Sequence, residues 1–332
     1  MFRRIASILL IASMLMCVSC GDNSSENSTL QSVTIATTEN IKINGAVMTY
    51  FYNDNMLAFL SSYSKVLDVI GLDPTKPFSE QPRKNGEGTW HDFFMSQATT
   101  VAHYLMALNE LAIADGISLS DAEKAAIEAS SEAVADGAYG MGVETEDIIA
   151  ARQLEALAYK YENTKKAELA PTLDEIEAYI ADEKDFEKDE SRTVNVRHIL
   201  ISGDIAAITA TRILDEFKNG DATTEEFALL ALEYSKDTGS CYSGGLYKNL
   251  TEGSTVEEFD EWCFDEVRKP GDTAVIETDF GAHVMYFEGE GLPAWQAEIE
   301  DKIASERLKE IRTARFEDYP VTFNTEALGI IG

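Results

Sequence analysis

The chain is 332 residues long, with 45% hydrophobic and 26% charged residues, and its formal net charge at pH 7 is −32. This length and apolar content are sufficient for a buried core and for two domains. So large a negative charge repels phosphate groups, which argues against nucleic acid as a partner and against docking on an anionic membrane surface. The charge indicates a highly soluble acidic surface and does not identify a substrate.

The N-terminal segment has the order of parts of a secretory signal. Arg3 and Arg4 precede an apolar run at residues 5–16, and Val18-Ser19-Cys20-Gly21 follows. The run is short for a permanent membrane-spanning helix. The tetrapeptide resembles the lipobox of bacterial lipoproteins, which makes Cys20 the expected lipidated residue. An ordinary signal peptide with an incidental cysteine is the alternative.

Residues 21–32 are mostly small and polar, which predicts a flexible tether ahead of a folded region. From residue 33 to residue 190 the pattern is mainly helical, after one strand predicted at 33–44. Residues 90–114 place apolar side chains three or four positions apart, which predicts one continuous buried helix face. Further helices are predicted at 49–69, from 121 up to the glycines at 137–142, at 145–164 and from 173 toward 181. Two of them start with capping boxes, Ser120 with Glu123 and Thr172 with Glu175.

Only two of the four cysteines, Cys241 and Cys263, lie beyond the signal-like segment. They allow either one disulfide, as in an exported protein, or two free thiols. No spacing of Cys and His residues resembles a zinc site, and the chain has neither a glycine-rich phosphate loop nor a nucleophile elbow. We therefore expect no metal and no cofactor.

The most informative stretch runs from residue 194 to residue 289. It begins with the β-branched segment Val194–Ile201 and ends with a short apolar run at 284–287 behind a glycine turn, and both ends predict strands. Each end carries one histidine, His198 or His283. Between them the pattern predicts helices at 205–218, 224–234 and 256–267, a glycine-punctuated loop and a strand at 274–277. A lone histidine in a strand is usually structural, but two that open and close one unit favour a shared site.

Several motifs follow one another through this stretch. They are Arg197-His198-Ile199-Leu200, Phe227 with Ala231 and Tyr234-Ser235-Lys236-Asp237, Gly244-Gly245, Phe259 with Phe264, Pro270-Gly271-Asp272, and Thr278-Asp279-Phe280-Gly281-Ala282-His283. In order and spacing the stretch resembles the parvulin family of peptidyl-prolyl isomerases. The resemblance implies that His198 and His283 are the paired central histidines of the site. It also implies that Asp237 occupies the family's cysteine or aspartate position and that Thr278 supports the histidines by hydrogen bonding.

The resemblance further implies a pocket for the proline ring of a substrate, with Phe259 as its aromatic residue and Phe280 on its rim. Two positions depart from the family pattern. Thr255 stands where a pocket methionine is usual, and Tyr247, or Leu246 if the loop shifts by one, stands where a leucine is usual. A more polar pocket is compatible with slower catalysis or with a module that only binds. The loop after residue 201 lacks the basic cluster of phosphate-directed parvulins, so phosphopeptide specificity is not expected.

A last amphipathic helix is predicted at 293–316, with Trp295, Ile299 and Ile303 on one side. Helices, a parvulin module and a returning helix resemble the exported PrsA/SurA-type foldases. The expected fold class is α+β, a parvulin module (a small antiparallel sheet flanked by helices) inserted in a mainly helical chaperone-like domain. The expected boundaries are a signal at 1–20, a tether at 21–32, a helical domain at 33–190 completed by 293–332, and the module at 191–290.

The resemblance implies a peptidyl-prolyl cis-trans isomerase that assists exported proteins outside the bacterial cytoplasmic membrane and is held there by a lipid on Cys20. Its expected partners are unfolded or partly folded exported proteins with X-Pro bonds. A homodimer is left open. The rival hypothesis is a non-catalytic extracytoplasmic chaperone that binds unfolded clients.

Overall fold

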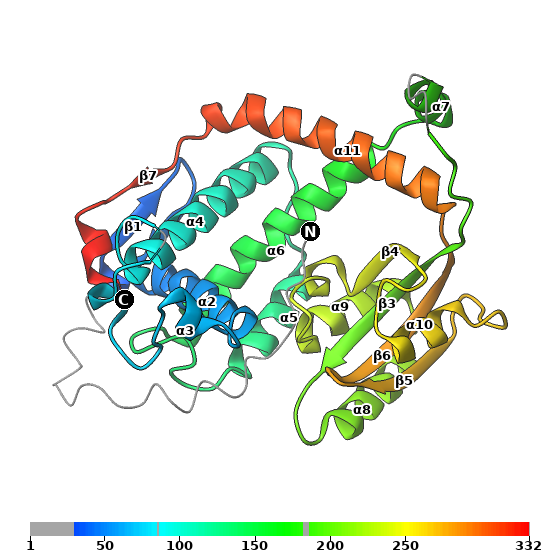
Figure 1. Cartoon of the computed structure of the whole chain (residues 1–332), viewed down its shortest axis with the longest axis horizontal. Helices are drawn as coiled ribbons and strands as arrows, with labels where there is room; N and C mark the ends of the chain where they lie inside the picture. The colour runs from blue at the N-terminus through cyan, green and yellow to red at the C-terminus, as the bar shows by residue number, and fades with distance from the viewer. Residues whose placement is uncertain (1–29, 85, 182–185, 332) are drawn as a thin grey trace. The chain divides into compact units, whose positions relative to one another are not determined.

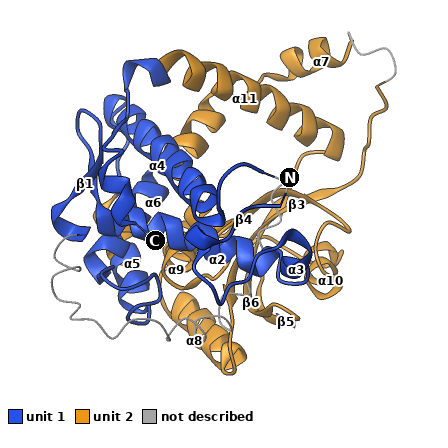
Figure 2. Cartoon of the chain, turned by 60° about the vertical axis from the view of Figure 1, so that its left-hand side comes forward, with its two compact units in different colours: residues 1–119, 127–158, 316–332 blue, residues 120–126, 159–315 orange. Residues whose placement is uncertain are grey.

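The structure is a computed structural model that describes residues 30–84, 86–181 and 186–331 (Figure 1). The predictions for the signal, for Cys20 and for most of the tether concern residues outside these ranges. The chain divides into two compact units (Figure 2). Among the described residues, the first contains those within 30–119, 127–158 and 316–331; the second contains those within 120–126 and 159–315. In the described ranges no helix is both long and apolar enough to cross a membrane.

The first unit contains a small antiparallel sheet in the order β2-β1-β7. Its strands are β1 (Thr34–Thr37), β2 (Lys42–Asn44) and β7 (Thr322–Phe323). The single strand predicted at 33–44 is therefore wrong, because a turn divides it into a hairpin. Glu110 holds this turn: its carboxylate accepts hydrogen bonds from the Thr38 hydroxyl and from the Asn40 backbone and side chain at 2.5–2.8 Å.

Helices make up the rest of the first unit. They are α2 (Gly45–Ser62), the short α3 (Leu67–Ile70) and α4 (Trp90–Ala114), with parts of α5 (Asp121–Glu132) and α6 (Thr145–Glu168). The α4 bounds match the prediction. Helix α2 starts four residues earlier than predicted, because the Asn44 side chain accepts a hydrogen bond from the Val47 amide (2.8 Å) and caps the helix.

The second unit holds a four-stranded antiparallel sheet in the order β4-β3-β6-β5. The strands are β3 (Thr193–Ile201), β4 (Leu246–Thr251), β5 (Thr273–Thr278) and β6 (Gly281–Glu290). Helices α8 (Ala206–Asn219), α9 (Thr224–Tyr234) and α10 (Glu257–Phe264) complete this module. The predicted α+β class is confirmed, although β4 replaces part of the predicted loop.

The two faces of this sheet carry separate apolar clusters. On one face Ile199, Ile201 and Val284 pack with residues of α8 and α9. On the other face Val194, Val196 and Met285 pack with Phe259, Trp262 and Cys263 of α10. Side chains alternate between the faces of a strand. His198 therefore shares the α10 face with Val196, and His283 shares it with Met285.

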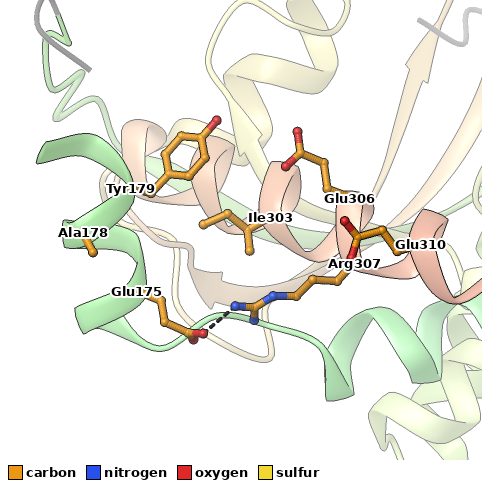
Figure 3. Close-up of a pocket in the computed structure, with 7 residues that line it drawn as sticks. All are labelled: Glu175, Ala178, Tyr179, Ile303, Glu306, Arg307 and Glu310. Atoms are coloured by element: carbon orange, nitrogen blue, oxygen red, sulfur yellow. Dashed lines mark hydrogen bonds and ion pairs between the residues drawn. The ribbon is translucent and has the colours of Figure 1, made fainter. Parts of the chain in front are cut away.

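Helices α7 (Leu173–Ala181) and α11 (Ala294–Arg315) lie in the second unit. The predicted apolar side of α11 packs on Ile176 of α7, which is only 1% exposed. An ion pair of 2.5 Å joins Arg307 and Glu175, at the edge of a shallow groove between the helices (Figure 3). The groove is lined by Glu175, Ala178, Tyr179, Ile303, Glu306, Arg307 and Glu310. The expected boundaries differ from this division. The segment 293–332 was expected to complete the helical domain as a whole, but only its residues from 316 onward lie in the first unit.

The C-terminal residues are integrated in the first unit. Strand β7 pairs with β1, with Ala36 opposite Phe323 and Thr37 opposite Thr322. Directly after it, η4 (Ala327–Ile330) contacts α2 and β1. Ile331 is 2% exposed, whereas its neighbour Ile330 is 41% exposed.

We predict that Ile331→Ala lowers the free energy of unfolding of the first unit by about 2–4 kcal/mol, because it leaves a cavity in a packed site. Ile330→Ala is the matched control and should change it by less than about 1 kcal/mol. Hydrogen exchange of the β1 and β2 amides measures the difference, with the β3 and β6 amides as an internal reference. Equal exchange in the two variants would contradict the packing of the C-terminal residues.

Candidate active site

The two histidines of the module form a buried, hydrogen-bonded pair. In the ladder between β3 and β6, His198 lies opposite Met285 and Leu200 lies opposite His283, so the rings meet on the diagonal. Their Nδ1 atoms are 3.1 Å apart, and the histidines are 3% and 4% exposed. One Nδ1 must donate a proton and the other must accept it, because two lone pairs or two N–H groups repel at this distance.

The outer partners assign the tautomers. The backbone N–H of Phe280 donates to Thr278 Oγ1 (3.1 Å), and Thr278 Oγ1 lies 2.9 Å from His283 Nε2. In the assignment that satisfies every group, the Thr278 hydroxyl donates to His283 Nε2 and His283 donates from Nδ1 to His198. His198 then donates from Nε2 to Asp237 Oδ2 at 2.9 Å. In this series of hydrogen bonds, from Thr278 through the two histidines, each donated hydrogen points toward Asp237.

Asp237 is an acceptor for four donors. Its Oδ2 accepts from His198, from the Ser240 hydroxyl (2.6 Å) and from the Tyr247 hydroxyl (3.0 Å). Its Oδ1 accepts from the Gly239 amide at 3.1 Å. Burial alone would raise the pKa of Asp237, but the hydrogen bonds from His198, the Ser240 hydroxyl and the Gly239 amide lower it well below its usual value. Asp237 is therefore a carboxylate.

Ser240 is a site residue that the sequence analysis missed. It is 1% exposed and lies within 3.3 Å of His198 Nε2 as well as bonding Asp237. Its position three residues after Asp237, behind a glycine, is the signal that could have found it, because Asp-x-Gly-Ser favours a turn that folds back on the aspartate.

Aromatic rings cover the histidine pair. Phe259 of α10 is 2% exposed, and its ring is nearly perpendicular to His198 (centroids 5.3 Å apart) and to His283 (5.5 Å). Tyr247 places its ring centroid 4.8 Å from that of His198 and 6.0 Å from that of Phe259. Of the two alternatives left open by the sequence, Tyr247 is therefore the residue whose side chain lies beside the histidines. Apolar rings beside a few fixed polar groups are typical of a pocket that binds a small ligand.

Two other expected pocket residues are placed differently. Thr255 uses its hydroxyl to bond the Asp260 carboxylate of α10. Its polar group thus serves the start of this helix. Phe280 is half-buried and supports the site through its amide on Thr278. A role in substrate binding for either residue stays a prediction.

The double glycine positions β4 beside the histidines. Gly244 and Gly245 have φ of 67° and 74°, and the Gly245 carbonyl accepts a hydrogen bond from the His198 amide (2.9 Å). A Cβ on Gly245 would lie 2.3 Å from the His198 carbonyl oxygen. Arg197 secures this loop from the other side, donating to the Ser243 and Gly244 carbonyls at 3.0 and 2.8 Å while it pairs with Glu288 at 2.5 Å.

Burial and the neighbouring His198 lower the pKa of His283 from its ordinary value of 6.5 to about 4, so His283 is neutral at physiological pH. This agrees with the tautomer assignment, in which His283 Nε2 is unprotonated and accepts a hydrogen bond from the Thr278 hydroxyl. Cys241 and Cys263 are buried and are not joined by a disulfide, and burial raises the pKa of Cys263 to about 12. Among the described residues, no group of three or more His, Cys, Asp or Glu side chains could hold a metal ion.

Comparison with known proteins agrees with this geometry. Residues 180–289 match the family model of the PPIC-type PPIase domain, so the module around the histidine pair is a parvulin-type domain. The chain is similar to PrsA foldases. It is 31% identical over 172 residues to Foldase protein PrsA 3 of Bacillus cereus, which covers 50% of this chain and 55% of the relative.

A second relative, Foldase protein PrsA of Caldanaerobacter subterraneus, is 33% identical over 109 residues, or 32% of each chain. The chain thus spans about half, or less, of the curated relatives it matches. The crystal structure of PrsA from Bacillus subtilis aligns with 74% of this chain and 88% of that chain at 18% identity and a TM-score of 0.30. A TM-score this low does not establish a shared arrangement of the whole chain.

We predict that Gly245→Ala destabilises the module strongly and disturbs the His198 resonances in NMR spectra, because the new Cβ meets a backbone oxygen that cannot move without breaking the His198–Gly245 hydrogen bond. Gly253→Ala is the matched control: its φ is +79° and a Cβ there meets no atom within 4 Å. The control should cost only the strain of a left-handed alanine, about 1–2 kcal/mol. A similar loss in both variants, measured by hydrogen exchange of β3, would show that the close approach is unimportant.

We predict that the module loses stability as the pH falls from about 6.5 to about 4. In this interval the unfolded chain protonates residue 283 and the folded chain does not, so the unfolded state binds more protons and is favoured. The pKa shift corresponds to about 3 kcal/mol. NMR titration of the His283 ring should give a midpoint near pH 4, and His283→Gln should remove this part of the pH dependence. An unchanged pH dependence in the variant would refute the assignment.

Proposed function

We propose that the chain is a peptidyl-prolyl cis-trans isomerase that assists the folding of exported proteins. The observation that carries the proposal is the buried pair of His198 and His283, oriented between Thr278 and Asp237 beneath Phe259, inside the segment that matches the PPIC-type PPIase model. The two relatives described above are both PrsA foldases, which supports the same function.

The reaction suits such a site. Rotation about an X-Pro bond has a barrier of roughly 18–20 kcal/mol, and uncatalysed isomerisation takes tens of seconds or longer. No covalent bond is broken and no net proton transfer is needed. A catalyst must hold the proline ring and favour the twisted amide, in which resonance is lost and the carbonyl is less polar. Stabilising the transition state more than the ground state is what accelerates the step.

Each group then has a role that matches its surroundings. Phe259 presents an apolar surface for the proline ring, and Tyr247 extends it. His283 is neutral and both rings are hydrogen-bonded at each nitrogen, so the pair offers a fixed polar surface that does not reorganise when the amide twists. Asp237 and Thr278 hold the rings at their two outer nitrogens. The roles are orientation and electrostatics, and none of these residues carries a proton to the substrate.

A second function, binding without catalysis, is favoured by one observation. The Tyr247 hydroxyl lies in the position where the family resemblance calls for leucine, so the pocket is more polar than expected. In that case the chain would be a chaperone that holds extended client segments. Isomerisation of a short X-Pro peptide distinguishes the two functions, because only the enzyme accelerates the exchange.

We further propose that the clients are unfolded or partly folded exported proteins and that the chain is anchored outside the bacterial cytoplasmic membrane by a lipid on Cys20. The basis is the signal-like N-terminal sequence with its lipobox-like tetrapeptide. One acyl chain holds a protein only marginally, so stable attachment requires two or more. The segment after β3, Ser202-Gly203-Asp204, has no basic residue, which supports clients without phosphate groups.

Phe259→Ala should lower kcat/KM of peptide isomerisation roughly ten- to a hundredfold, since burial of an aromatic ring is worth about 1.5–3 kcal/mol. Phe264→Ala, on the same helix and half-buried, is the matched control and should retain most of the activity. Protease-coupled or NMR exchange assays give both values. Equal losses would indicate that Phe259 acts through helix stability and does not contact the proline.

Replacing the lipidation candidate tests the anchor. Cys20→Ala should release the chain from the membrane fraction or leave it unprocessed, and mass spectrometry of the wild-type N-terminus should find an acylated cysteine. A Cys20→Ala chain that stays in the membrane with the wild-type mass would rule out the lipoprotein hypothesis and leave the isomerase proposal intact.

A further inference from the structure

Tyr247 is placed in the site by the register of β4. It lies opposite Val196 in the ladder with β3, and Val196 belongs to the face of the sheet that α10 covers. Its neighbour Leu246 lies opposite Arg197. The Tyr247 side chain therefore projects onto the same face as His198, where its ring packs in the cluster with Phe259 and its hydroxyl reaches Asp237.

The hydroxyl of Tyr247 completes the coordination of Asp237. The Asp237 side chain is 11% exposed, so water contributes little to its solvation. A carboxylate oxygen has two lone-pair sites, yet Oδ2 receives three donors: His198, Ser240 and Tyr247. Burial and the negative charge of Asp237 raise the pKa of Tyr247, so its phenol is protonated and donates. The three donors come from β3, from the turn at Ser240 and from β4, and together they hold Asp237 Oδ2 in place.

We infer that Tyr247 is a positioning residue of the isomerase site, whose hydroxyl holds Asp237 as a hydrogen-bond acceptor and thereby fixes the tautomer of His198. This inference rests on the proposed function. It assigns two separable tasks to one side chain: the ring borders the proline pocket, and the hydroxyl acts on the histidine pair through Asp237.

The direction of the hydrogen bonds from Thr278 through both histidines depends on the contact between His198 and Asp237. His198 offers its Nδ1 lone pair to His283 only while Nε2 carries the proton, and Nε2 carries it because Asp237 accepts. An Asp237 that turned away from Nε2 would allow His198 to move its proton to Nδ1. The Nδ1 atoms of the two rings, 3.1 Å apart, would then both carry hydrogens, and the pair would separate. Donors from two further elements, Ser240 in the turn and Tyr247 on β4, prevent Asp237 from turning.

The test separates ring from hydroxyl. In the full chain, Tyr247→Phe should lower kcat of X-Pro peptide isomerisation three- to tenfold and leave KM within twofold, because the ring remains. Tyr286→Phe is the matched control: Tyr286 lies on the opposite face of the sheet, where its ring packs on Phe217 and Phe227, and this variant should retain wild-type kcat and KM.

A spectroscopic readout accompanies the kinetics. With one donor fewer to hold Asp237 in place, the His198 Nε2–H hydrogen bond should weaken, and its proton resonance should move upfield in Tyr247→Phe. Ser240→Ala, which removes another donor from the same oxygen, should move it in the same direction, and Tyr286→Phe should not move it. A merely structural role for Tyr247 would change stability without this shift.

Unchanged kcat together with an unchanged His198 resonance in Tyr247→Phe would overturn the inference. A rise in KM with unchanged kcat would also overturn it, by reducing Tyr247 to a wall of the pocket. A wild-type chain that does not accelerate isomerisation would overturn the proposed function instead, and the NMR comparison would then decide the coupling of Tyr247 to Asp237 by itself.

Discussion

The hydrogen bond between the Nδ1 atoms of His198 and His283 constrains the rest of the site. A single proton lies between two buried rings, so the rings must take opposite roles at their inner nitrogens and therefore at their outer ones. One outer nitrogen needs a donor, which the Thr278 hydroxyl supplies, and the other needs an acceptor, which the Asp237 carboxylate supplies. The residue types at both ends follow from this one contact.

The sheet makes this contact durable. Strands β3 and β6 are the central pair of the four, and both histidines project toward α10, where Phe259 covers them. Low exposure keeps His283 neutral and leaves the hydrogen bonds in a medium of low dielectric constant, where they are strong. A rigid surface of this kind is suited to a reaction in which an amide twists and no proton is transferred.

Much of the site was accessible from the sequence, because its residues lie in motifs with fixed spacing. The alternation in β3 and β6 places both histidines on one face, and the turn before β6 brings Thr278 to His283. Strand β4 was not predicted: it is an edge strand with Lys248 and Asn249 in its middle, and Asn249 has a positive φ of 51°. It has neither a run of β-branched residues nor a regular alternation of apolar and polar residues, the two patterns that predict a strand. Ser240 was missed because its role exists only once the turn has folded onto Asp237.

In the mainly helical parts, too, the local elements were predicted better than their tertiary contacts. Helix α4 has a long regular apolar face and its bounds were correct, whereas the hairpin of β1 and β2 depends on Glu110, a residue more than sixty positions away. The apolar side of α11 was recognised, but its contact with Ile176 of α7 is a tertiary choice that no local pattern specifies. Periodicity identifies a buried face and does not identify its partner.

The pairing of Thr37 with Thr322 also has a consequence for the order of events during synthesis. Strand β1 leaves the ribosome long before β7 exists, and at roughly 5–20 residues per second the delay is of the order of tens of seconds. During that time the edge of β1 that β7 will occupy has unpaired backbone groups, which invite pairing with other chains. A chain that enters another compartment from its N-terminus can therefore complete the first unit only after its last residues have arrived, when the parvulin-type module has already had time to fold.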